Sequence, residues 1–183
     1  MAKSKLSEFK QLIAEMNEDE LRVELMKLYN KIPTVKELYN QDLMTEEERQ
    51  ALLQNYKDRI YNEYWSSKGN PKNPNNTNIK NIIGEYEKTA VFPYDIIDLL
   101  LFRVETTNDF ANQFGGASDG TYNGSLTSFK KAVKLMNENN LRSHFEIHCK
   151  KIFKSYNIDG WYIMQLEHLF EERKMEEDYE TEN

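Results

Sequence analysis

The sequence predicts an all-α fold, an irregular bundle of eight or nine helices without a sheet. Apolar residues recur at spacings of three and four along most of the chain, the period that aligns side chains on one face of an α-helix. No pair of alternating segments joined by a hairpin turn occurs in the sequence. No self-similar repeat of about 34 or 40 residues occurs either, so a tetratricopeptide or HEAT array is not indicated.

Capping boxes and a proline divide the first part of the chain into helices. Asn17 with Glu20, and Thr45 with Glu48, each provide the side chains that cap a helix N-terminus reciprocally. Pro33 stops or restarts the helix, because proline lacks an N–H and disfavours a helical residue at the preceding position. The expected helices of this part, each with one apolar face, span residues 6–16, 18–32 and 46–65, and a short segment with apolar residues lies at 35–39.

Two long loops divide the rest. Residues 66–78 contain glycine, two prolines and a run of asparagines, which favours a loop or hinge. Residues 115–124 hold four of the seven glycines and predict a second loop. Pro93 suits the first turn of a helix whose most apolar part, residues 96–104, predicts the most buried helix. The other expected helices span residues 78–86, 126–136, 141–156 and 158–173.

A chain of 183 residues is long enough to bury a core. We expect one domain over residues 1–170, with a possible hinge at 66–78. Residues 171–183 carry 2 basic and 7 acidic side chains and few apolar ones, which predicts a disordered tail.

Composition excludes some classes of protein. No stretch approaches the roughly 20 apolar residues that a membrane span needs, and no apolar run follows the first lysines as in a signal peptide. The single cysteine, Cys149, excludes an internal disulfide framework and a cysteine-based zinc cluster. We therefore expect a cytoplasmic protein without a membrane partner.

No set of residues predicts a metal or a cofactor. His144 and His148 have the spacing of two ligands on one helix face, but Phe145 stands where a zinc protease has glutamate, and Lys151 lies on the same face as His148. The glycine loop from Asp119 partly resembles a calcium-binding EF-hand loop, yet its closing position holds a lysine instead of the bidentate glutamate. The same loop lacks the Lys-Ser/Thr pair of a phosphate-binding loop.

One combination of residues is compatible with an enzyme. Cys149 lies on an apolar helix face, where cysteine is usually a small buried hydrophobe. A cysteine nucleophile paired with His168 across the fold stays open as an alternative, although no local motif indicates it.

An acidic stripe follows the central helix. Asp95, Asp98, Glu105 and Asp109 share one face, with Phe102 between them. Such a stripe is usually the solvated side of an amphipathic helix, and it is also compatible with divalent ions or a basic helix.

Lysine clusters provide a second alternative function, weak nucleic-acid binding. Tyr64 and Trp65, just before the first cluster, are able to stack on bases. Arginine, the usual fork for phosphates, is scarce, and the net charge is -7. The candidate anion contacts are Lys68, Lys72, Lys80, Lys130, Lys131 and Lys134.

The favoured hypothesis is a small non-catalytic protein that binds a protein partner or itself. Aromatic side chains are common interface anchors, and the helix expected at 46–65 ends in three candidates. They are Tyr61, Tyr64 and Trp65.

Several segments resemble an uncharacterised bacterial family of all-helical proteins of about 180 residues, a domain of unknown function. They are LSEF…LIAEM, DELRVELMKLYNKIPTVKELY, NYKDRIYNEYW, Tyr122-x-x-Ser125 with SFKKAVKL, and IDGWY…LEHLF. The resemblance spans nearly the whole chain, which implies one unit. Its motifs include no catalytic set, so it implies no activity.

Overall fold

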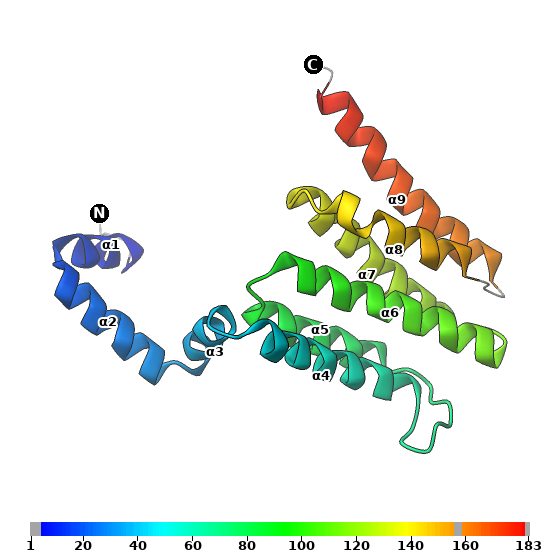
Figure 1. Cartoon of the computed structure of the whole chain (residues 1–183), viewed down its shortest axis with the longest axis horizontal. Helices are drawn as coiled ribbons and strands as arrows, with labels where there is room; N and C mark the ends of the chain where they lie inside the picture. The colour runs from blue at the N-terminus through cyan, green and yellow to red at the C-terminus, as the bar shows by residue number, and fades with distance from the viewer. Residues whose placement is uncertain (1–4, 156–158, 182–183) are drawn as a thin grey trace. The chain divides into compact units, whose positions relative to one another are not determined.

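The computed structural model describes residues 5–155 and 159–181, without the side chains of residues 37, 41, 42, 89 and 172–181 (Figure 1). The described ranges form nine helices and contain no β-strand, which confirms the predicted all-α class. The helices are α1 (Lys5–Glu15), α2 (Glu18–Lys31), α3 (Pro33–Asp42), α4 (Glu46–Tyr64), α5 (Asn76–Thr89), α6 (Pro93–Phe114), α7 (Asp119–Glu138), α8 (Arg142–Lys154) and α9 (Gly160–Thr181).

The chain forms two compact units, Met1–Leu43 and Met44–Asn183. In the first unit α2 packs on α3, and the Tyr29 hydroxyl donates a hydrogen bond of 2.7 Å to Oδ1 of Asn40. Neither α1 nor α2 contains a buried residue.

Helix α6 forms the centre of the second unit and contacts α4, α5, α7 and α8 (Figure 1). Its residues Leu99, Leu100, Leu101 and Val104 are at most 1% exposed. This confirms that residues 96–104 belong to the most buried helix. Because α6 is central, polar residues along it meet side chains from several neighbouring helices.

The helix starts that local sequence signals predict are present in the structure. The Asn17 side chain accepts from the Glu20 N–H and the Thr45 side chain from the Glu48 N–H, and both reciprocal capping bonds are present. Pro93 occupies the first turn of α6. These signals involve residues three positions apart, so they act within one turn of helix.

The predicted glycine loop at 115–124 is wrong in its second half. Helix α7 begins at Asp119, where the Ser118 hydroxyl caps the Thr121 N–H at 3.3 Å. The helix therefore includes Gly120 and Gly124, whose low helix propensity favoured a loop. Residues that are helical cannot wrap a calcium ion as an EF-hand loop does.

Gly124 lies in the helix because it faces a buried arginine. Arg103 is 4% exposed, and its Nη1 and Nη2 each donate a hydrogen bond of 3.0 Å, to Ser128 and Asn76. A Cβ at position 124 would lie inside van der Waals contact of Nη2 and 3.1 Å from Oδ1 of Asn76. Tertiary contact thus overrides the local preference of glycine.

The segment expected as a hinge, residues 66–78, lies inside the second unit, and α5 begins two residues before its end. Its start folds back on α4: the Lys72 N–H donates to the Tyr64 carbonyl at 2.8 Å, and Gly69 adopts a φ of 74° in the turn. Helix α9 continues to Thr181. The single domain, the hinge and the disorder of residues 171–183 stay predictions.

No helix among the described residues combines the length and the apolar character that crossing a membrane requires.

Candidate functional site

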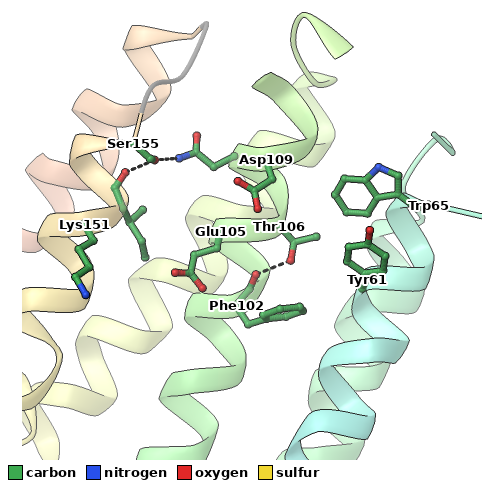
Figure 2. Close-up of a pocket in the computed structure, with 10 residues that line it drawn as sticks. Tyr61, Trp65, Phe102, Glu105, Thr106, Asp109, Lys151 and Ser155 are labelled. Carbon is green, nitrogen blue, oxygen red and sulfur yellow. Dashed lines mark hydrogen bonds between the residues drawn. The ribbon is translucent and has the colours of Figure 1, made fainter. Parts of the chain in front are cut away.

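A cleft of about 380 Å³ opens between α4, α6 and α8 in the second unit. Figure 2 shows Tyr61 of α4 and Trp65, the residue that follows this helix, on one side, Lys151 and Ser155 on the other, and residues of α6 between them. This size is at the small end of ligand pockets. The lining residues are Tyr61, Trp65, Phe102, Glu105, Thr106, Asn108, Asp109, Lys151, Ile152 and Ser155.

Stacked aromatic rings form the α4 side of the cleft. Tyr61 and Trp65 are four residues apart, so they lie on one face of the helix end, with ring centroids 4.5 Å apart and planes 19° apart. Trp65 is buried and packs edge-on against Phe110, whereas Tyr61 is 47% exposed. Phe102 of α6 also faces the cleft, and the Lys57 ammonium lies 5.5 Å from its ring centroid.

The acidic stripe of α6 is present, and cations from α4 pair with its first two members. Arg49 Nη1 lies 3.4 Å from Oδ2 of Asp95, whose side chain is 2% exposed. Lys57 Nζ donates to both carboxylate oxygens of Asp98 at 2.9 Å. These two acids hold α4 against α6.

The third acid pairs with α8. His148 Nε2 lies 2.7 Å from Oε1 of Glu105, and this hydrogen bond raises the pKa of His148 more than burial lowers it. The pair links α6 to α8 at the edge of the cleft.

The fourth acid, Asp109, faces the cleft without a partner. It makes no hydrogen bond or ion pair with any side chain or backbone group that the structure describes. Asp109 is exposed, and the partial burial of its carboxyl group, followed by the charge of Glu105, raises its pKa. A cation in the cleft would therefore find an uncompensated carboxylate.

The raised pKa of His148 gives a pH-dependent stability. The pair makes its full contribution to the free energy of unfolding below about pH 6.5, the pKa of histidine in an unfolded chain. This contribution is lost as the pH rises through the higher pKa of His148 in the folded state. Because the His148 and Glu105 side chains are 31% and 40% exposed, we expect the pair to stabilise the fold by less than about 1 kcal/mol. Urea unfolding at pH 6 and pH 8 measures it.

His148→Gln removes this difference between the two pH values, whereas His144→Gln, at an exposed position, keeps it. An unchanged pH dependence in His148→Gln would contradict the role of the pair.

The structure separates the three expected interface aromatics. Tyr61 and Trp65 line the cleft. Tyr64 is fully buried, and its hydroxyl lies 2.7 Å from Oγ1 of Thr107. A partner therefore has access to Tyr61 and the cleft edge of Trp65, and Tyr64 belongs to the core.

The expected anion-contact lysines are all exposed and lie on different elements. Lys68 and Lys72 lie in the loop between α4 and α5, Lys80 on α5, and Lys130, Lys131 and Lys134 on α7. Lys72 donates to the Asn62 carbonyl, Lys131 pairs with Glu87, and Lys134 lies 3.6 Å from Glu138. The three α7 lysines line an open hollow of about 380 Å³ together with Glu138.

The remaining chemical candidates do not form a site in the part of the chain that the structure describes. No group of three metal-ligating side chains comes together there. His148 bonds to Glu105, and His144 is exposed. Cys149 is fully buried, and burial raises the pKa of its thiol to about 12. A buried thiol with this pKa is not a nucleophile at neutral pH.

Several cleft residues gave no signal in the sequence. Thr106 and Asn108 belong to α6, and Ile152 and Ser155 to α8 and its end. The Asn108 amide donates to the Ser155 hydroxyl across 47 positions of sequence, so no local pattern brings these residues together.

The comparisons with known proteins agree with the resemblance seen in the sequence. The model of a family described as "Family of unknown function (DUF6155)" matches residues 1–172. The chain belongs to this family. The match covers the first compact unit and the second as far as residue 172, so sequence of both units belongs to the family. No curated protein and no solved structure matches the chain.

Proposed function

We propose that this member of the family is a non-catalytic cytoplasmic interaction protein whose cleft between α4, α6 and α8 receives a basic side chain of a protein partner. The observation that carries the proposal is Asp109, a carboxylate without a partner among the described residues, set in a cleft with an aromatic wall. The single cysteine, buried and free, agrees with a reducing compartment.

A guanidinium fits this cleft in two ways. Its N–H groups donate charge-assisted hydrogen bonds, which are stronger than those between neutral groups, to the Asp109 carboxylate. Its flat face stacks on an aromatic ring, and the exposed Tyr61 and the half-buried Phe102 line the same cleft as the acid. Lys57, which lies over Phe102, is an example of such a cation–ring contact in the same molecule.

The charges around the cleft favour the binding of a cation with modest affinity. Oε1 of Glu105 is already paired with His148, whereas the Asp109 carboxylate has no partner among the described residues. Lys151 contributes one positive charge from α8 and is exposed. An incoming cation therefore approaches from the α4 side, where Tyr61 and Trp65 lie (Figure 2).

A single arginine side chain provides the direct test. The probe is the capped peptide Gly-Gly-Arg-Gly-Gly, and its neutral counterpart replaces arginine with glutamine. The readout is the indole N–H resonance of Trp65, distinguished from that of Trp161 with a Trp161→Phe variant. We expect the arginine peptide to shift the Trp65 resonance and the glutamine peptide to leave it unchanged.

Asp109→Asn is expected to weaken binding of the arginine peptide about threefold to fivefold, since Asp109 is exposed and an exposed ion pair contributes up to about 1 kcal/mol. Asp58→Asn is the matched control, because Asp58 is an exposed acid of α4 that accepts a hydrogen bond from Gln54. Equal binding by Asp109→Asn, or equal binding of both peptides, would overturn the proposal.

A further inference from the structure

The first unit carries apolar side chains that nothing in it covers. Helices of 11 and 14 residues are marginal in water on their own, and most of their stability in proteins comes from burying an apolar face. Neither α1 nor α2 buries a residue, although both are amphipathic. Their exposed large apolar residues are Leu6, Phe9, Leu12, Ile13, Leu21, Val23, Leu25 and Met26.

An open groove of about 550 Å³ lies between α1 and α2. Its apolar surface comes from Leu12, Met16 and Val23. Leu12 is 52% exposed and Val23 is 68% exposed, so the rest of the first unit does not cover their side chains.

Acidic residues border this groove. They are Glu15, Asp19, Glu20 and Glu24. Lys27 lies 2.9 Å from Glu24 and Arg22 lies 3.5 Å from Asp19, but such exposed pairs within one helix are weak. The border therefore keeps an excess of negative charge around an apolar surface.

This combination selects the chemistry of the occupant. A nucleic acid or an anionic lipid surface would place its phosphates beside the four acids. A second copy of the same groove would bring like charges together. A helix with an apolar stripe flanked by lysine or arginine complements both the surface and its border, in the manner of a helix-in-groove interface.

We propose that the groove between α1 and α2 binds a basic amphipathic helix of a partner protein. The site is separate from the α4–α6–α8 cleft and does not rest on the function proposed for it.

The test uses the full-length protein and a fluorescein-labelled 18-residue peptide of leucine and lysine in an amphipathic helical pattern. Anisotropy reports its binding. Two peptides with the same leucine pattern carry glutamine or glutamate in place of lysine. We expect the lysine peptide to bind at least tenfold more tightly than the glutamine peptide, and the glutamate peptide not to bind.

Val23→Gln is expected to weaken binding of the lysine peptide fivefold or more. Ile147→Gln is the matched control and should stay within twofold, since Ile147 is also 68% exposed but lies on α8. Asp109→Asn should not change binding of this peptide, which separates this test from that of the cleft.

Three results would overturn the inference. They are equal binding of the three peptides, equal weakening by Val23→Gln and Ile147→Gln, and a dimer of the free chain that Val23→Gln dissociates. The last result would assign the groove to a second copy of the chain.

Discussion

Gly124→Val is expected to destabilise the protein by about 3 kcal/mol, because the new side chain meets the guanidinium of Arg103. Arg103 is buried and holds Ser128 and Asn76 through its two terminal nitrogens. Moving it costs hydrogen bonds of a charged donor, about 1.5–3 kcal/mol, and overpacking adds about 1–3 kcal/mol, partly offset by the better helix propensity of valine. Urea unfolding measures the change in the free energy of unfolding.

Gly84→Val is the matched control for this substitution. Gly84 also lies within a helix, but no atom outside its own helical segment lies within 4 Å of a Cβ built there. We expect no loss of stability, or a gain of a few tenths of a kcal/mol. A double variant with Arg103→Met should recover part of the loss. If Gly124→Val proved as stable as Gly84→Val, the packing of Arg103 on α7 would be refuted.

Arg49→Met is expected to cost about 3 kcal/mol at pH 7, because it leaves the buried Asp95 carboxylate without its cation. Oδ1 of Asp95 already has no hydrogen-bond partner among the described residues. Methionine keeps the aliphatic stem of arginine, so the loss reflects mainly the charge, including the contact of Arg49 with the Phe92 ring.

The pH dependence identifies the cause. Burial raises the pKa of Asp95 above its unfolded value, and Arg49 opposes this shift, so Arg49→Met raises the pKa further. A carboxyl whose folded-state pKa is raised contributes most favourably below its unfolded pKa of about 3.9, and that contribution is lost as pH rises through the folded-state pKa. The deficit of Arg49→Met should therefore be smaller at pH 4.5 than at pH 7.

The double variant Arg49→Met/Asp95→Asn should recover most of the loss at pH 7, since asparagine needs no counter-ion. The same deficit at both pH values and in the double variant would show that Arg49 acts through packing alone.

Features determined within one helical turn were predictable from the sequence. The capping boxes at Asn17 and Thr45 and the proline at the start of α6 involve neighbouring residues, and they form as predicted. The glycines at 120 and 124 misled the prediction, because the contact that places Gly124 in a helix comes from Arg103 on another helix.

The cleft depended on contacts that no local pattern contains. Tyr61, Trp65 and Asp109 were candidates from the sequence, but their meeting requires α4 and α6 to pack side by side. Tyr64 lies only three positions from Tyr61 and one from Trp65, yet it points into the core. Residue type and approximate position were predictable, and the choice between surface and core depended on the rotation of α4 about its axis.

The measurement that tests the central claim most directly is the arginine-peptide titration of three proteins in parallel: wild type, Asp109→Asn and Asp58→Asn. The account expects the Trp65 indole resonance to shift in wild type and in Asp58→Asn, which bind the peptide with equal affinity, and Asp109→Asn to bind it about threefold to fivefold more weakly. Equal affinity in all three proteins, or no shift of Trp65 in any of them, would contradict the assignment of the cleft as a site for a partner's basic side chain.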